Sequence, residues 1–253
     1  MKLQVYFFIF FILPSLLNSR KKGVGLSSEF GNEQLVALNV SWYYNWGSNS
    51  DFNSSQSDFV PMVFSGRTLK KTYPFNFSHI LGFNEPDNEN QANLSSSLAF
   101  QLWPQIVSKA KSLKPNSALI GSPAMAGSSL REGSWLPIFM GFKPEVDFIA
   151  VHWYKGPDAE KFKRDIKNII DYYNLPVWVT EFAPQTTGSS RENPNKYTQN
   201  EINEFIKQTV QWMEKESMVH RYAWHNSKID GSTSCLFKED GTLSETGKVY
   251  SCS

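Results

Sequence analysis

Short β-rich runs alternate with polar or helical stretches along most of this chain of 253 residues, and the alternation constrains its fold more than any other feature. Such an alternation is typical of parallel βα units. Several of the runs are almost continuously apolar, as expected for strands that helices cover on the outside. Eight strands are predicted: Val24–Ser27, Val40–Asn45, Phe59–Phe64, His79–Phe83, Ala118–Ser122, Phe148–Trp153, Val177–Glu181 and Tyr222–Trp224.

Helical periodicity is clearest in three stretches between these strands: Ser96–Leu113, Asp158–Tyr173 and Thr198–Glu216. Asp158 is suited to cap the second of these helices, and the third begins with Thr-Gln-Asn-Glu, a capping-box pattern. Shorter helices are expected at Glu29–Leu38 and around Trp135–Met140, whereas Gly47–Asp58 is a loop rich in Ser, Asn and Asp.

We therefore predict an α/β fold, a compact (β/α)8 TIM-type barrel in which some outer helices are reduced. The rival fold is an open doubly wound sheet, whose usual ligand signature is GxGxxG or GxxxxGK directly after a strand. Neither sequence follows any predicted strand, which favours the barrel. Residues 20–253 are expected to form a single domain.

Charge and motif content exclude several kinds of partner. The formal net charge is only +1, whereas binding to nucleic acid or to an acidic membrane surface needs a clear basic excess. No CxxC or HExxH motif is present, and the histidines lack i, i+4 spacing. We therefore predict no metal site, no cofactor and no nucleic-acid partner.

The first residues have the pattern of a secretory signal peptide. Lys2 provides a short positive region, Leu3–Leu17 is mostly apolar, and Asn18 and Ser19 end it. We predict that residues 1–19 are the signal peptide and that the mature protein is a secreted monomer without a membrane segment. The alternative is an N-terminal membrane anchor, for which the apolar stretch is short.

Two further features fit an oxidising compartment. The only cysteines, Cys235 and Cys252, follow the last predicted strand, and in such a compartment they are predicted to pair as a disulfide. The alternative is two free thiols. Four Asn-X-Ser sequons are candidate glycosylation sites: Asn39, Asn53, Asn76 and Asn93. Asn39 directly precedes a predicted strand, which would limit its access.

Two predicted strands lead into a glutamate. The fourth continues into Asn-Glu-Pro with Glu85, and the seventh ends in Val-Thr-Glu with Glu181. In a barrel of this type, catalytic groups lie at the C-terminal ends of the strands. A single glutamate in such a place is most often a surface or capping carboxylate. Two that face one cavity match glycoside cleavage, in which one carboxylate attacks the anomeric carbon and the other protonates the leaving oxygen.

Alternation along the strands predicts which neighbours of the glutamates point inward. Trp178 has the opposite parity to Glu181 and is predicted to face the helices. The side chains that share the parity of the glutamates are predicted to fill the barrel interior: Leu81, Phe83, Val177 and Val179.

Aromatic residues make up 15% of the chain and include eight Trp. Trp46, Trp153 and Trp224 lie at or just beyond predicted strand ends, where they are placed to stack on the apolar faces of sugar rings. Only a bulge would let Trp153 and the adjacent His152 both face the mouth. Core packing is predicted for four others: Trp42, Trp103, Trp178 and Trp212. The predicted substrate-binding set is completed by Asn45, Asn84, His152 and Tyr154.

The chain resembles glycoside hydrolase family 128, a family of small secreted β-1,3-glucanases in the large retaining clan. The resemblance covers nearly the whole mature chain. It is carried, in chain order, by Tyr43–Trp46, Phe59–Met62, Leu81–Asp87, Gln91–Ser95, Val151–Tyr154, Val177–Ala183 and Asp240–Ser244 with Gly247. His225, after Trp224, departs from the pattern, since another aromatic residue is expected there.

The resemblance implies a retaining hydrolase that cleaves β-1,3-glucan by double displacement, with Glu85 as general acid/base and Glu181 as nucleophile. It also implies a β-glucan groove lined by aromatic side chains. We expect endo action, and Asn84 is placed to bind the sugar 2-hydroxyl. The alternative is a β-glucan-binding protein that keeps the groove on the same barrel without the chemistry.

Overall fold

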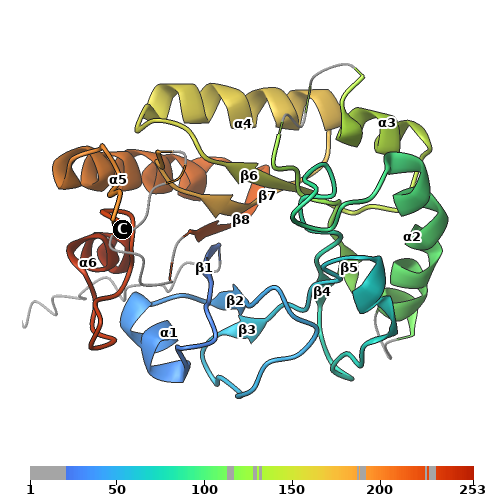
Figure 1. Cartoon of the computed structure of the whole chain (residues 1–253), viewed down its shortest axis with the longest axis horizontal. Helices are drawn as coiled ribbons and strands as arrows, with labels where there is room; N and C mark the ends of the chain where they lie inside the picture. The colour runs from blue at the N-terminus through green and yellow to red at the C-terminus, as the bar shows by residue number, and fades with distance from the viewer. Residues whose placement is uncertain are drawn as a thin grey trace, which may run out of the picture.

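Parallel strands form the centre of the molecule and helices surround them (Figure 1). The computed structural model describes residues 21–112, 117–127, 130, 133–186, 188, 192–225, 227 and 232–253. The strands are β1 (Lys22–Gly25), β2 (Trp42–Tyr44), β3 (Asp58–Phe59), β4 (His79–Ile80), β5 (Leu119–Ile120), β6 (Ile149–Trp153), β7 (Val177–Phe182) and β8 (Val219–Trp224).

Hydrogen bonding closes these strands into a barrel. Six strands pair in the order β3-β2-β1-β8-β7-β6, and β4 pairs with β5. Single parallel bridges join the two sheets, from Met62 to Leu81 and from Gly121 to Phe148. The predicted TIM-type barrel is therefore confirmed. Regular pairing in β3, β4 and β5 is shorter than predicted, and Pro61 contributes to this because it has no N–H to donate to a ladder.

The predicted helices are present with their predicted caps. Asp158 accepts the N–H of Lys161 at 2.8 Å, and Thr198 forms the capping box with Glu201. No helix lies between β2 and β3, and only a 3-10 helix lies between β3 and β4, which agrees with the expectation of reduced outer helices. The helices are α1 (Asn32–Leu38), η1 (Gly66–Lys70, the 3-10 helix), α2 (Ser96–Lys111), α3 (Trp135–Gly141), α4 (Ala159–Tyr173), α5 (Gln199–Lys215) and α6 (Glu245–Cys252).

The α6 helix was not predicted. It contains a glycine and β-branched residues, which are weak helix formers. Close packing requires a glycine at position 247, because a Cβ there would lie 2.1 Å from the carbonyl oxygen of Leu236.

Lys22 in β1 ties this last helix to the first strand. Its Nζ donates to the carbonyls of Tyr250, Ser251 and Ser253 at 3.1, 3.0 and 2.9 Å. Carbonyls at a helix C-terminus lack partners within the helix, so the ammonium group satisfies them. Burial lowers the pKa of Lys22 to about 8, although the charge of Glu214 raises it.

Two apolar clusters show which side chains point inward. One cluster consists only of residues on strands or their continuations, and it fills the barrel: Trp42, Tyr44, Val60, Met62, Leu81, Phe148, Trp178 and Ala223. The other lies between strands and helices and includes Phe83, Val177 and Val179. The inward prediction holds for Leu81, but it is wrong for Phe83, Val177 and Val179, and the outward prediction for Trp178 is also wrong.

Register shifts in β7 explain the errors for Val177, Val179 and Trp178. The pairing of β7 with β8 slips between Val179 and Phe182, so alternation along β7 is broken just before Glu181. Trp178 therefore faces the barrel interior, and Val179 faces the helices. The shift after Val179 then turns the side chain of Glu181 toward the barrel mouth. Trp178 stacks on Phe148 with ring centroids 4.2 Å apart, and the Arg221 guanidinium lies 4.7 Å from its ring.

The structure contradicts the predicted disulfide. Cys235 is buried, Cys252 is exposed, and no disulfide bond joins them. Oγ of Ser244, the N-cap of α6, donates to the carbonyl of Cys235 at 2.5 Å, so Cys235 lies beside the start of that helix. Cys252 is the last residue of the helix. At the helical rise, about 12 Å separates the two ends, whereas a disulfide needs Cα atoms within about 7 Å of each other.

The predicted signal peptide, residues 1–19, lies outside the described residues. No helix in the part of the chain that the structure describes is long and apolar enough to cross a membrane. Of the sequon asparagines, Asn53, Asn76 and Asn93 are exposed, whereas Asn39 is half-buried at the C-cap of α1.

Replacing Trp178 with alanine should lower the free energy of unfolding by about 3–5 kcal/mol, because it opens a cavity in the barrel interior. Denaturant unfolding measures the change. Tyr172→Ala is the control, since that side chain is 58% exposed and its loss should be within about 0.5 kcal/mol. A loss for Trp178→Ala as small as that of the control would contradict this view of the core.

Candidate active site

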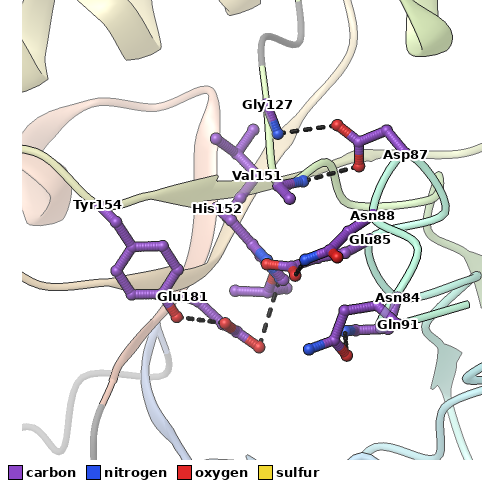
Figure 2. Close-up of polar contacts among 12 residues, drawn as sticks. Asn84, Glu85, Asp87, Asn88, Gln91, Gly127, Val151, His152, Tyr154 and Glu181 are labelled. Atoms are coloured by element: carbon purple, nitrogen blue, oxygen red, sulfur yellow. Dashed lines mark hydrogen bonds and ion pairs between the residues drawn. The ribbon is translucent and has the colours of Figure 1, made fainter. Parts of the chain in front are cut away.

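The two glutamates singled out by the sequence meet at the barrel mouth. Glu181 is near the end of β7, and Glu85 follows β4 directly after the bridge from Asn84 to Ala124. One carboxylate oxygen of each lies within 4.8 Å of the other and of a ring nitrogen of His152. Figure 2 shows these three side chains pointing toward one another.

Glu181 is a buried carboxylate held by aromatic donors. Its Oε1 accepts the Tyr44 hydroxyl at 3.0 Å and the Trp46 indole N–H at 2.8 Å. The hydroxyl of Tyr154 donates to Oε2. Only 5% of the residue is exposed, so these donors replace the water that a free carboxylate would bind.

The environment favours the ionised form of Glu181. Burial, the largest single effect, would raise its pKa. The charges of His152 and His225 and the hydrogen bonds from Tyr154 and Trp46 outweigh burial and hold the pKa of Glu181 below its ordinary value. A carboxylate that stays charged is suited to act as a nucleophile.

Glu85 has a different environment. Its Oε1 lies 2.9 Å from Nδ1 of His152, and Oε2 accepts the side-chain N–H of Asn88 at 3.3 Å. The side chain is 12% exposed, twice the 6% of the Glu181 side chain. The two carboxylates therefore have unequal surroundings, as a pair with two different roles requires.

His152 lies between the glutamates and links them. While Nδ1 faces Glu85, Nε2 lies 3.5 Å from Oε1 of Glu181, outside hydrogen-bond geometry. Burial would lower the pKa of His152, but Glu181, Glu85 and Asp87 together raise it. The imidazolium form is thus stabilised, and it offsets part of the negative charge of the pair.

Two residues of the site have strained backbones. Glu85 has φ 41° and Trp46 has φ 58°, the left-handed region that non-glycine residues rarely adopt. Such strain persists where surrounding contacts hold it, and it clusters at functional sites. Gly25 makes room for the Trp46 ring, because a Cβ there would lie 3.0 Å from it.

Three of the predicted substrate-binding residues line this site and a fourth lies beside it. Trp46, His152 and Tyr154 all face Glu181. Asn84 is buried next to Glu85, and its Nδ2 donates to Gln91 at 3.2 Å. The Asn84 Oδ1 has no hydrogen-bond partner among the residues described.

The prediction of substrate contact is wrong for Trp153 and Trp224. Trp153 is 3% exposed and donates its indole N–H to Asp165, and Trp224 is fully buried and donates to the carbonyl of Ser234. Both pack in the cluster between strands and helices, and Trp153 does so because its neighbour His152 has the parity of the mouth. A register shift between Val151 and His152 does not bring Trp153 inward.

Asn45 has a local role in the structure. Its Oδ1 accepts the N–H of Gly47 at 3.0 Å, and its Nδ2 donates to the carbonyl of Asn49 at 3.0 Å. Both ends of the amide thus hold the turn that carries Trp46.

Sequence reasoning missed Tyr44, Asn88 and His225 as members of the site. Tyr44 has the same parity as Trp46, so alternation along β2 was the signal for it. His225 packs edge-on against the rings of Trp46 and Tyr154, with centroids 5.9 and 5.4 Å apart. It therefore fills the place where an aromatic residue was expected. Asn88 had no sequence signal, because it reaches Glu85 through a turn.

Glu85, His152 and Glu181 form the one group within the described ranges whose spacing would suit a metal ion. The hydroxyl and indole donors of three aromatic residues already point at Glu181, and Nδ1 of His152 faces Glu85. A cation would compete with these donors for the same oxygens, so the donor set favours a hydrogen-bonded carboxylate pair.

Trp46→Phe should raise the pKa of Glu181, because it removes an N–H that stabilises the carboxylate form. A pH titration of the ¹³C-labelled Glu181 carboxyl group by NMR measures this. Trp135→Phe is the matched control, since that indole N–H donates instead to the carbonyl of Leu94. An unchanged pKa of Glu181 in Trp46→Phe would show that the indole does not stabilise the anion.

Comparison with known proteins agrees with this geometry. A family model described as "Glycosyl hydrolase catalytic core" matches residues 27–250. A curated relative, Alkali-sensitive linkage protein 1 of Schizosaccharomyces pombe, is 29% identical over an alignment of 231 residues that covers 87% of this chain. The chain spans about two fifths of the length of that relative, 41%.

Solved structures of glycoside hydrolase family 128 are also similar. An endo-β-1,3-glucanase from Amycolatopsis mediterranei, in complex with laminaritriose, is 27% identical with a TM-score of 0.78, over 92% of this chain and 99% of that one. An endo-β-1,3-glucanase from Sorangium cellulosum is 27% identical with a TM-score of 0.77, over 91% and 97%. A curdlan-specific exo-β-1,3-glucanase from Blastomyces gilchristii is 25% identical with a TM-score of 0.70, over 92% and 98%. The predicted resemblance is confirmed: the chain belongs to the glycosyl hydrolase catalytic core family and is similar to the enzymes of glycoside hydrolase family 128.

Proposed function

We propose that the protein is a retaining endo-β-1,3-glucanase, with Glu181 as nucleophile and Glu85 as general acid/base. The observation that carries the proposal is the approach of the two carboxylates, with oxygens within 4.8 Å. Retaining enzymes hold their carboxyl groups about 5–5.5 Å apart, whereas inverting enzymes leave about 6.5–9.5 Å for a water molecule. The substrate class is supported by the similar Amycolatopsis enzyme, which is in complex with laminaritriose.

In the first step, a lone pair of the Glu181 carboxylate attacks the anomeric carbon. The glycosidic bond breaks, and Glu85 gives its proton to the departing oxygen, which leaves as a hydroxyl group. The donors from Tyr44, Trp46 and Tyr154 hold Glu181 in orientation for this attack. A glycosyl ester on Glu181 results.

In the second step, Glu85 is a carboxylate and acts as a base. It takes a proton from water while the water oxygen bonds to the anomeric carbon, and Glu181 leaves as a carboxylate. The same Tyr44, Trp46 and Tyr154 donors stabilise the charge that returns to Glu181. Two inversions at one carbon give net retention.

Endo action is supported by the similar endo-β-1,3-glucanases from Amycolatopsis mediterranei and Sorangium cellulosum. A cavity of about 360 Å³ lies between the loops after β1 and β2 and against Trp46, which donates to Glu181. A glucan chain that extends from the glutamates can place further sugar units in this cavity.

We further propose that the mature protein is secreted as an N-glycosylated monomer that binds β-glucan rather than nucleic acid or membrane. The signal-peptide pattern of residues 1–19 and the net charge of +1 support this. Asn53, Asn76 and Asn93 are exposed and accessible to the modifying enzyme, and the half-buried Asn39 is the least accessible sequon.

Glu181→Gln should lower hydrolysis of soluble β-1,3-glucan by about a thousandfold or more, because an amide cannot form the glycosyl ester. Glu85→Gln should lower it by about a hundredfold or more. Release of reducing ends by residues 20–253 measures both. Glu89→Gln, an exposed change on the same turn as Glu85, is the control and should keep full activity.

Parallel assays on a β-1,4-glucan and a β-1,4-mannan define the substrate class. Products from β-1,3-glucan alone are expected. If the folded wild-type protein binds β-1,3-glucan and releases nothing, the protein is a glucan-binding protein instead of a hydrolase.

Proton NMR of the newly formed reducing ends should show the β-anomer first, because double displacement retains configuration. Early products from a long β-1,3-glucan should be oligosaccharides of several lengths. Initial formation of the α-anomer would refute the retaining mechanism. Glucose as the sole early product would refute endo action.

A further inference from the structure

Asp87, two residues after Glu85, binds the loop that follows β5. Its Oδ1 accepts the backbone N–H of Ala126 at 2.9 Å, and its Oδ2 accepts that of Gly127 at 2.8 Å (Figure 2). Hydrogen bonds from two consecutive amides to one carboxylate are charge-assisted and fix its direction. Asp87 thus connects the turn that carries Glu85 to a neighbouring loop of the barrel mouth.

The backbone around Glu85 explains why a side chain makes this connection. As far as Glu85 the main chain pairs with the β5 side, since Asn84 bridges to Ala124 and the Glu85 N–H donates to the Ala124 carbonyl at 2.8 Å. At Glu85 φ becomes positive and Pro86 follows, so the main chain turns away. Further along the loop after β5, the N–H groups of Ala126 and Gly127 donate to the Asp87 carboxylate instead of to a main-chain carbonyl.

The residue opposite Asp87 is shaped for the contact. A Cβ on Gly127 would lie 3.0 Å from Oδ2 of Asp87, closer than ordinary packing allows. The absence of a side chain at Gly127 therefore lets the carboxylate reach both amides.

The same turn holds the Glu85 side chain. The N–H of Asn88 donates to the Glu85 carbonyl at 3.0 Å, and its side-chain amide donates to Oε2 of Glu85 at 3.3 Å. A left-handed backbone at a non-glycine residue costs on the order of 1–3 kcal/mol and needs surrounding contacts to persist. Asp87 lies between Glu85 and Asn88, so displacement of Asp87 moves both.

We propose that Asp87 is a positioning residue for the proton-transfer step: by clamping the turn of Glu85 to the Ala126–Gly127 loop, it holds the Glu85 carboxyl group where the leaving oxygen departs. This inference rests on the proposed role of Glu85 as general acid.

The test compares two substrates that differ in their need for an acid. One is β-1,3-glucan, and the other is dinitrophenyl β-laminaribioside, whose leaving group departs without a proton. Asp87→Ala and Asp87→Asn should lower kcat/KM on β-1,3-glucan by about tenfold to a hundredfold, part of what a general acid contributes. On the dinitrophenyl substrate kcat/KM should change little, because it reports only the step of Glu181 attack.

Gly127→Ala tests the clamp from its other side, since the added methyl group displaces the Asp87 carboxylate without removing its charge. It should lower kcat/KM on the glucan selectively, as the Asp87 variants do. Glu89→Gln removes a nearby charge outside the clamp and should leave both substrates unaffected. Thermal unfolding of each variant shows that it is folded at the assay temperature.

Equal losses on both substrates, or no loss on β-1,3-glucan, would overturn the assignment of Asp87. The proposed function fails in a different way, if the wild-type protein cleaves neither substrate or if Glu85→Gln lowers both equally. The two failures are therefore distinguishable.

Discussion

The buried anion of Glu181 is the constraint on which the barrel mouth depends. Removing a carboxylate from water costs several kcal/mol unless hydrogen bonds and opposite charge replace the solvent. Here the replacements come from separate strands, with Tyr44 and Trp46 at the end of β2 and His152 and Tyr154 at the end of β6. These strands must keep their register with β7 for the donors to converge, so the chemistry of the site and the pairing of the barrel depend on each other.

Regular geometry is relaxed where the site needs it. Pairing slips at β7 just before Glu181, and the backbone of Glu85 enters the left-handed region. Below these points the barrel interior is filled by large rings such as Trp42, Phe148 and Trp178. A rigid, tightly packed interior supports irregular backbone at the mouth, because the strain is confined to a few residues that neighbouring contacts hold.

The sequence was informative where a signal was local or repeated. Apolar runs predicted eight strands, capping patterns predicted the starts of α4 and α5, and the position of Glu85 and Glu181 after two such runs predicted their meeting. The sequence did not predict which side chains point inward where the strand pairing is irregular. A bulge reverses parity without any marker in the residues, so Trp178 was placed outside and Val179 inside.

The sequence also did not show which of the aromatic residues near strand ends would be buried under helices and which would face the site. Trp46, Trp153 and Trp224 all lie near strand ends, yet only Trp46 faces Glu181, because the others pack under α4 and α5 against side chains such as Phe205. Cys235 and Cys252 are likewise separated by the length of α6, a helix that was not predicted because its residues have weak helix propensity. Such outcomes are decided by tertiary packing rather than by residues adjacent in the chain.

The contacts of Lys22 with the end of α6 have a consequence for how the barrel folds. One edge of β1 pairs with β2, which follows it closely in the chain. Its other edge pairs with β8, and the buried ammonium group of Lys22 donates to carbonyls of α6, both near the end of the sequence. Contacts between residues so far apart in the chain form slowly, since a long loop must close first. During synthesis the barrel therefore cannot close before β8 has been made, and until then one edge of β1 is unpaired and accessible to other chains.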